Sequence, residues 1–143
     1  MKTGIVYKTL LGSTRRYARW LSEEISADVY QMKEMKGERL GDYEVILIMS
    51  GTYIGFMPLI KYLKKNWAML ENKKVVAVAI GVAPPDDIWS QKSYNKIPEH
   101  IRNKIKYFKL PGRMGEKGKD NVIKDNLEPV IEYLRSERVV NSI

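Results

Sequence analysis

A short hydroxyl-rich loop near the start of the chain carries the first residues that could bind a ligand. It lies between an apolar segment and a run of helical periodicity. Hydroxyl groups and a glycine at the start of a helix suit an anion, because the first helical N–H groups have no internal partner and the helix dipole favours negative charge there. The spacing matches neither the dinucleotide fingerprint nor the P-loop. The candidate anion-binding residues are Thr9, Leu10, Leu11, Gly12, Ser13 and Thr14.

A second loop of unusual composition follows the most apolar segment of the chain. It combines glycines, hydroxyl groups and a tyrosine. This mixture suits a planar heteroaromatic ligand, because glycine lets the backbone approach closely and an aromatic ring can stack on the ligand. The candidate residues of this loop are Ser50, Gly51, Thr52, Tyr53, Ile54 and Gly55.

Apolar segments alternate with helical patterns along the whole chain, and this alternation indicates how the loops are positioned. We expect strands at residues 4–7, 27–32, 43–49, 74–80 and 105–110, and helices at residues 15–25, 56–70 and 127–134, with a helix of about two turns opening at Pro98. The alternation predicts an α/β fold with a parallel sheet and helices on both faces. Ligands of such folds bind beyond the carboxyl ends of the strands. The loops at residues 8–14, 50–55 and 81–97 should therefore meet there.

The composition limits the class of protein. The length of 143 residues suggests a single domain, residues 1–143. No apolar run is long enough to span a membrane, and no signal-peptide pattern opens the chain. The chain has no cysteine, which excludes disulfides and thiol chemistry and fits a cytoplasmic location. The single histidine, His100, is expected on the surface, so we predict neither a metal site nor a serine–histidine triad.

The positive charge is concentrated late in the chain. The formal net charge is +8, and residues 92–119 carry nine basic side chains against two acidic ones. Such a field attracts acidic proteins, anionic membrane surfaces or nucleic acid, although a lysine-rich surface that only favours solubility would look the same. No nucleic-acid recognition motif accompanies the charge, so no specific nucleic-acid partner is expected.

The loops resemble those of a known family. Residues 9–14 resemble the FMN phosphate loop of flavodoxins, commonly T-x-T-G-x-T, with Leu11 in place of the second threonine. The sequence S-G-T-Y-I-G at residues 50–55 resembles the flavodoxin loop that holds the isoalloxazine ring. The third loop departs from the family's G-x-G-D, because no second glycine follows Gly81. Trp89 and Tyr94 are candidates for the aromatic that covers the other flavin face in many flavodoxins, but neither is assigned to the site.

This resemblance, to short-chain flavodoxin-domain proteins, implies a fold and a cofactor. The fold would be a flavodoxin-like three-layer sandwich with a five-stranded parallel sheet in the order 2-1-3-4-5. The cofactor would be FMN, with its phosphate on Thr9, Ser13 and Thr14 and its ring near the second loop. The flavin performs the chemistry in such proteins, so no catalytic side chain is named. The third loop would contribute Gly81, Val82 and Ala83.

The function implied is electron transfer between partner proteins, with an acidic redox partner; the protein would be a monomer or a homodimer. Peripheral contact with a membrane surface stays open. The alternative is a flavin-dependent oxidase or quinone reductase resembling flavodoxin-type protoporphyrinogen oxidase. Those relatives carry a long amphipathic insertion after the fifth strand, whereas residues 111–120 are short and hydrophilic. A receiver domain without flavin would need an aspartate near Ser50, at the end of the central strand.

Overall fold

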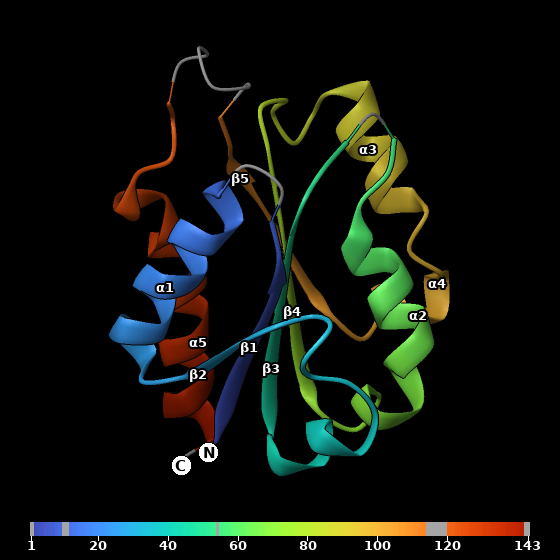
Figure 1. The fold of residues 1–143 in the computed structure, drawn as a ribbon, viewed down its shortest axis with the longest axis vertical. Coiled ribbons are helices and arrows are strands. Elements are labelled where there is room, and N and C mark those ends of the chain that lie inside the picture. Colours follow the sequence, from blue (N-terminus) through green and yellow to red (C-terminus); the bar gives the residue numbers. More distant parts are fainter. Residues whose placement is uncertain (1, 10–11, 54, 114–119, 142–143) are drawn as a thin grey trace.

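A five-stranded parallel sheet forms the centre of the molecule (Figure 1). The computed structural model describes residues 2–9, 12–53, 55–113 and 120–141, with side chains described to residue 136. Within these residues the strand order is β2-β1-β3-β4-β5, which confirms the expected topology. The strands are β1 (Thr3–Lys8), β2 (Asp28–Gln31), β3 (Val45–Gly51), β4 (Lys74–Gly81) and β5 (Lys106–Pro111).

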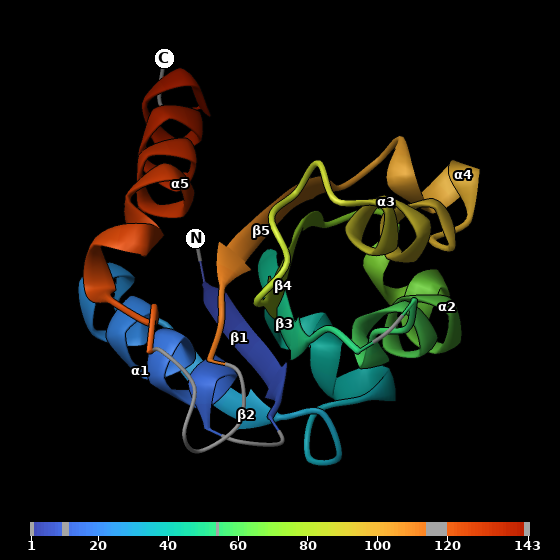
Figure 2. The same ribbon diagram turned by 90° about the horizontal axis from the view of Figure 1, so that it is seen from above.

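Helices cover both faces of the sheet and give a three-layer sandwich (Figures 1 and 2). Helices α1 (Ser13–Ile25) and α5 (Glu128–Asn141) lie on one face. Helices α2 (Pro58–Leu70), α3 (Ile88–Asn95) and α4 (Glu99–Arg102) lie on the other. Two 3₁₀ helices, η1 (Gly37–Asp42) and η2 (Lys124–Leu127), precede β3 and α5. No helix of the described residues is both long enough and apolar enough to cross a lipid bilayer.

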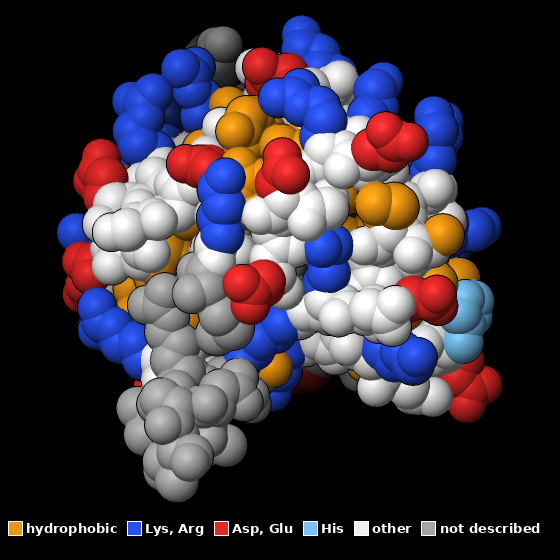
Figure 3. Space-filling model, turned by 90° about the horizontal axis from the view of Figure 1, so that it is seen from below, with side chains coloured by type: hydrophobic (Ala, Val, Ile, Leu, Met, Phe, Trp, Pro, Cys, Tyr) orange, Lys and Arg blue, Asp and Glu red, His pale blue; other side chains and the backbone are white. Residues whose placement is uncertain are grey.

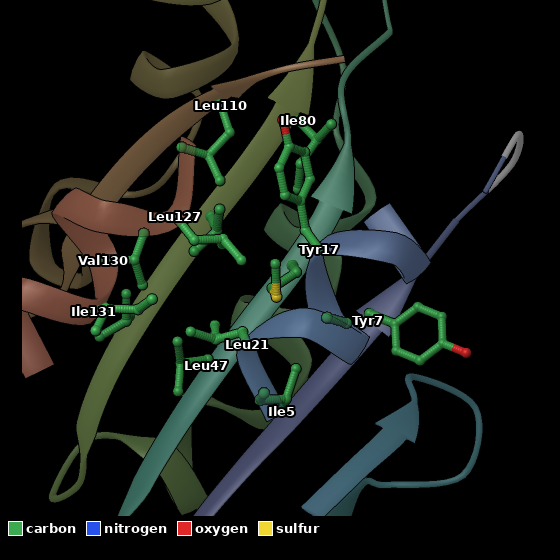
Figure 4. Packing of buried hydrophobic residues seen from close by; sticks show 14 of the residues in the cluster. Ile5, Tyr7, Tyr17, Leu21, Leu47, Ile80, Leu110, Leu127, Val130 and Ile131 are labelled. Atoms are coloured by element: carbon green, nitrogen blue, oxygen red, sulfur yellow. The ribbon is translucent and has the colours of Figure 1, made fainter. Parts of the chain in front are cut away.

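Each face of the sheet has its own hydrophobic core. On one face Ile5 and Leu47 pack with Tyr17 and Leu21 of α1, and Leu127 of η2 closes the cluster (Figure 4). On the other face the alternate residues of the same strands pack against α2 and η1. Strands β3 and β4 are buried on both sides, which explains why their sequences are apolar without interruption.

The structure corrects two expectations about the region after β4. Residues 81–97, expected to form a loop, contain the helix α3. Its N-cap is Asp87, whose side chain accepts a hydrogen bond from the Trp89 N–H at 2.9 Å. The helix expected to open at Pro98 has four residues rather than two turns. His100 is exposed, as expected, with its ring 6.4 Å from that of Trp67.

Candidate functional site

The loops that follow β1, β3 and β4 meet at the carboxyl edge of the sheet (Figure 2). They form a depression of about 100 Å³. It brings together most of the site residues that the sequence predicts, from three separate loops, and adds two residues that follow β5. The lining residues are Thr9, Ser13, Thr14, Gly51, Thr52, Tyr53, Ile80, Gly81, Val82, Gly112 and Arg113.

The first loop is built to start α1 without a side-chain cap. The Thr9 hydroxyl accepts a hydrogen bond from the Gly12 N–H at 2.9 Å, which closes the turn. Gly12 has φ of 92°, a conformation that favours glycine. No side chain of the described residues caps the helix, and its first two residues, Ser13 and Thr14, line the depression. Leu10 and Leu11 lie outside the described residues.

The second loop presents two aromatic rings. Tyr53 and Phe56 exchange backbone hydrogen bonds, both 2.7 Å long, around Gly55, whose φ is 66°. Their rings stack with centroids 6.2 Å apart, and they are 38% and 53% exposed. Partial burial raises the pKa of the Tyr53 hydroxyl. Ile54 lies outside the described residues.

The third loop approaches the second so closely that no side chain fits between them. A β-carbon on Gly81 would lie 2.0 Å from the Thr52 hydroxyl oxygen. The Thr52 N–H donates to the Ile80 carbonyl at 2.8 Å, and the Gly112 N–H donates to the Gly81 carbonyl at 3.0 Å. This close packing aligns the ends of β3, β4 and β5 along one side of the depression.

Comparison with known proteins assigns this arrangement to a family. The sequence matches the flavodoxin domain over residues 4–117. The chain belongs to the flavodoxin domain family. Curated protein sequences give no significant match. The fold of this flavodoxin-domain protein is also similar to those of solved flavodoxins.

The solved structures share the fold at low sequence identity. The flavodoxin of Streptococcus pneumoniae TIGR4 is 13% identical, with 100% of each chain covered and a TM-score of 0.62. A short-chain flavodoxin associated with a bacterial microcompartment is 13% identical, with 96% of this chain and 99% of that chain covered and a TM-score of 0.61. A flavodoxin from the Archaea is 16% identical, with 92% of each chain covered and a TM-score of 0.56.

Four described residues of the expected site do not line the depression: Gly12, Ser50, Gly55 and Ala83. The Ser50 side chain is fully buried; its hydroxyl accepts from the Leu59 N–H at 3.2 Å and donates to the Gly51 carbonyl at 3.2 Å. It therefore joins the end of β3 to the first turn of α2. Ala83 lies beside the depression, and its carbonyl accepts a hydrogen bond from the Lys109 ammonium at 2.8 Å.

Three basic residues of the segment 92–119 lie near the site, although sequence reasoning did not assign them to it. Arg113 lines the depression from the segment after β5. Because ligands of parallel sheets bind beyond the carboxyl ends of the strands, this position could have been predicted. Lys96 of α3 donates to the Gly55 carbonyl and holds the second loop. Lys109 donates to the third loop and to the Ser90 hydroxyl at 2.7 Å, and burial lowers its pKa. The Lys96 and Lys109 side chains thus hold the second and the third loop by hydrogen bonds to backbone carbonyls.

Trp89 lies at the start of α3 and is 48% exposed. A β-carbon on Gly55 would be 3.7 Å from its ring, so the indole packs beside the second loop. The Lys92 ammonium lies 4.7 Å from the centre of the indole ring system. Tyr94 instead packs into the scaffold, with its ring 4.7 Å from that of Tyr107. Trp89, not Tyr94, is thus the aromatic of α3 that lies near the site.

Proposed function

We propose that this protein binds FMN noncovalently in the depression and carries electrons between partner proteins. The observation that supports the proposal best is the meeting of an uncapped helix N-terminus with a half-exposed tyrosine across one depression. The phosphate group of FMN would bind at the helix N-terminus, and its aromatic ring would contact the tyrosine. Membership of the flavodoxin domain family supports the same cofactor.

The residues of the first loop fit a phosphate. The hydroxyls of Ser13 and Thr14 and the free N–H groups of α1 are hydrogen-bond donors on one wall. Arg113 adds a positive charge, and none of the described lining residues is acidic. This side of the depression, which includes the buried Thr14, would hold the phosphate group.

The second and third loops fit an aromatic ring. Tyr53 offers a ring face, and Val82, 46% exposed, offers apolar surface from the third loop. Gly51 and Gly81 also line this part of the depression, where their lack of a β-carbon leaves the backbone accessible to a planar group. When bound, the flavin supplies the electron-transfer chemistry, while the protein binds it, orients it and shields it from water. The exposed rings of Phe56 and Trp89 would form the rim that a partner approaches.

Electron transfer between proteins is tested with the FMN-loaded protein. The loaded protein is reduced and mixed under anaerobic conditions with a one-electron acceptor protein, and its visible absorbance is followed. The proposal predicts complete reoxidation by the acceptor protein and a far slower reaction with a small quinone. Rapid turnover of the quinone with a slow reaction toward every acceptor protein would show that the protein is an enzyme rather than a carrier.

A further inference from the structure

A second and larger groove opens on the other side of the second loop. Its volume is about 610 Å³, which lies in the range of ligand-binding clefts. It runs between α2, the carboxyl ends of β1 and β2, and the connection from β2 to η1, which swings toward α2 in Figure 2. Its charged lining residues are all basic: Lys8, Arg15, Lys33, Lys36, Lys61 and Lys65. We call this surface the basic groove.

The charges of the basic groove are not neutralised by the protein. Among the described residues, none of its six basic side chains forms an ion pair, a side-chain hydrogen bond or a cation–π contact. The carboxylate of Glu34, in the same connection, accepts a hydrogen bond from the Gln31 N–H at 2.9 Å. Six like charges around one groove repel one another, and an anionic ligand would relieve this repulsion.

The floor of the basic groove is preformed. The Tyr62 hydroxyl donates to the Met35 carbonyl, and Asn66 accepts from the Gly37 N–H at 3.1 Å and donates to the Tyr62 carbonyl at 3.0 Å. These polar groups are already satisfied, so the groups left to recognise a ligand are chiefly the cations, the Gln31 side chain and the exposed Phe56 ring. A ligand of the groove should therefore be acidic and partly apolar.

Several other basic residues of the chain do have partners. Within the basic segment that the sequence singles out, Lys96 and Lys109 hold loop carbonyls, and Lys106 lies 5.5 Å from the Phe108 ring centre. At the amino ends of the strands, acidic and basic side chains are interspersed (Figure 3). Among the described residues, the basic groove gathers six positive charges without such partners.

We propose that the basic groove docks an extended acidic segment of the redox partner. The inference rests on the proposed electron-transfer function. Lys61 and Lys65 are one helical turn apart, about 6 Å along α2, and alternate side chains of an extended chain repeat at about 6.6 Å. A segment with acidic residues at alternate positions can therefore pair with both. The cations come from four separate parts of the chain, which suits an elongated ligand better than a single phosphate.

The position of the groove supports this partner. Phe56 lines the basic groove and stacks on Tyr53, which lines the depression. Thr9 lines both. A partner segment seated in the groove would thus lie beside the proposed flavin site. Charge complementarity of this kind speeds encounter and fixes orientation.

The test is a fluorescence anisotropy titration of the FMN-loaded protein with a labelled peptide in which glutamates alternate with uncharged residues around one phenylalanine. Lys61→Glu/Lys65→Glu should weaken peptide binding about tenfold or more at about 0.15 M ionic strength. The matched control, Lys64→Glu/Lys104→Glu, changes the net charge by the same amount at exposed positions outside the groove. It should change peptide affinity less than about threefold. Neither pair should alter FMN affinity.

The titration overturns the proposal if both pairs weaken peptide binding equally, because the interaction would then be a general effect of charge. ATP serves as a small polyanion. If ATP binds more tightly than the peptide and loses its binding in the groove pair, the groove is a small-molecule site and the proposal is wrong. Failure of the wild-type protein to bind FMN would contradict the proposed function, while peptide binding would still report on the groove.

Discussion

Thr14 links the hydrophobic core to the proposed phosphate site. The residue is 2% exposed, yet it lines the depression beside the uncapped start of α1. Its backbone is fixed by the first turn of the helix, which begins with the hydrogen bond from the Arg16 N–H to the Gly12 carbonyl at 3.0 Å. A hydroxyl held in this way needs little reordering to bind an anion.

Removal of the Thr14 hydroxyl should therefore weaken FMN more than riboflavin, because only FMN carries the phosphate. We expect Thr14→Val to lower FMN affinity about tenfold, as for a hydrogen bond to a charged group, and to change riboflavin affinity little. Quenching of flavin fluorescence measures both. Thr3→Val, at the opposite end of β1, is the control and should change neither. An equal loss for the two flavins would argue against a phosphate contact.

An exposed ion pair makes stability depend on pH. The Arg16 guanidinium donates to Asp120 at 2.8 Å and, with the Val122 N–H, lowers the pKa of this carboxyl below its usual value. A lowered folded-state pKa adds stability above the unfolded-state value, and this is lost as the pH falls through the folded pKa. Between about pH 5 and pH 2, Asp120→Asn should lose stability less steeply than wild type in urea denaturation. Parallel pH profiles would contradict this expectation.

At the scale of elements, the ends of β3, β4 and β5 are held together by backbone contacts without room for side chains. Gly81 is the tightest position, because its β-carbon position is occupied by the Thr52 hydroxyl. Gly112 is also close, with its β-carbon position 3.2 Å from the Gly81 Cα. The shape of the depression depends on this packing.

A methyl group at residue 81 should therefore be costly. We expect Gly81→Ala to lower the free energy of unfolding by about 1–3 kcal/mol, as for other insertions into a packed region. Gly41→Ala is the control, because its β-carbon would meet only the Met69 side chain at 3.9 Å. It should change stability by less than about 0.5 kcal/mol. Chemical denaturation measures the free energy of unfolding of both variants. Equal losses would show that the contact at Gly81 relaxes easily.

The elements were predictable where one residue pattern determined them. The apolar runs of β3 and β4 and the spacing of Tyr17, Ala18 and Leu21 are local signals, and these elements formed as expected. Helix α3 was missed because its apolar periodicity is weak, although Asp87 before it is a usual N-cap residue.

The candidate site was predictable only in part. Three loops could be assigned to one edge because the carboxyl ends of parallel strands meet there. The contacts that hold those loops could not be predicted, because Lys96 is 41 residues from Gly55 and Lys109 is 26 residues from Ala83. The basic groove could not be predicted either, because its cations are brought together by tertiary structure rather than by a run of basic sequence.

At the scale of the whole molecule, charge should select the partner. The net charge is +8, and the basic groove lies beside the rim of the proposed flavin site. Electron transfer to an acidic acceptor protein should slow markedly between about 0.1 M and 1 M salt, because the Debye length falls from about 10 Å to about 3 Å. Stopped-flow absorbance measures the rate. Transfer to a basic acceptor should not slow, and rates to the acidic acceptor that stay flat would contradict steering by charge.

The depression at the carboxyl edge, as an FMN site, should recognise the phosphate group. Calorimetric titration of the purified wild-type protein with FMN and with riboflavin tests this recognition. We predict one FMN bound per chain, with an affinity at least about tenfold higher than that for riboflavin, because the start of α1, its hydroxyls and Arg113 act on the phosphate alone. Equal affinities for the two flavins, or no heat of binding with FMN, would contradict phosphate recognition at this site.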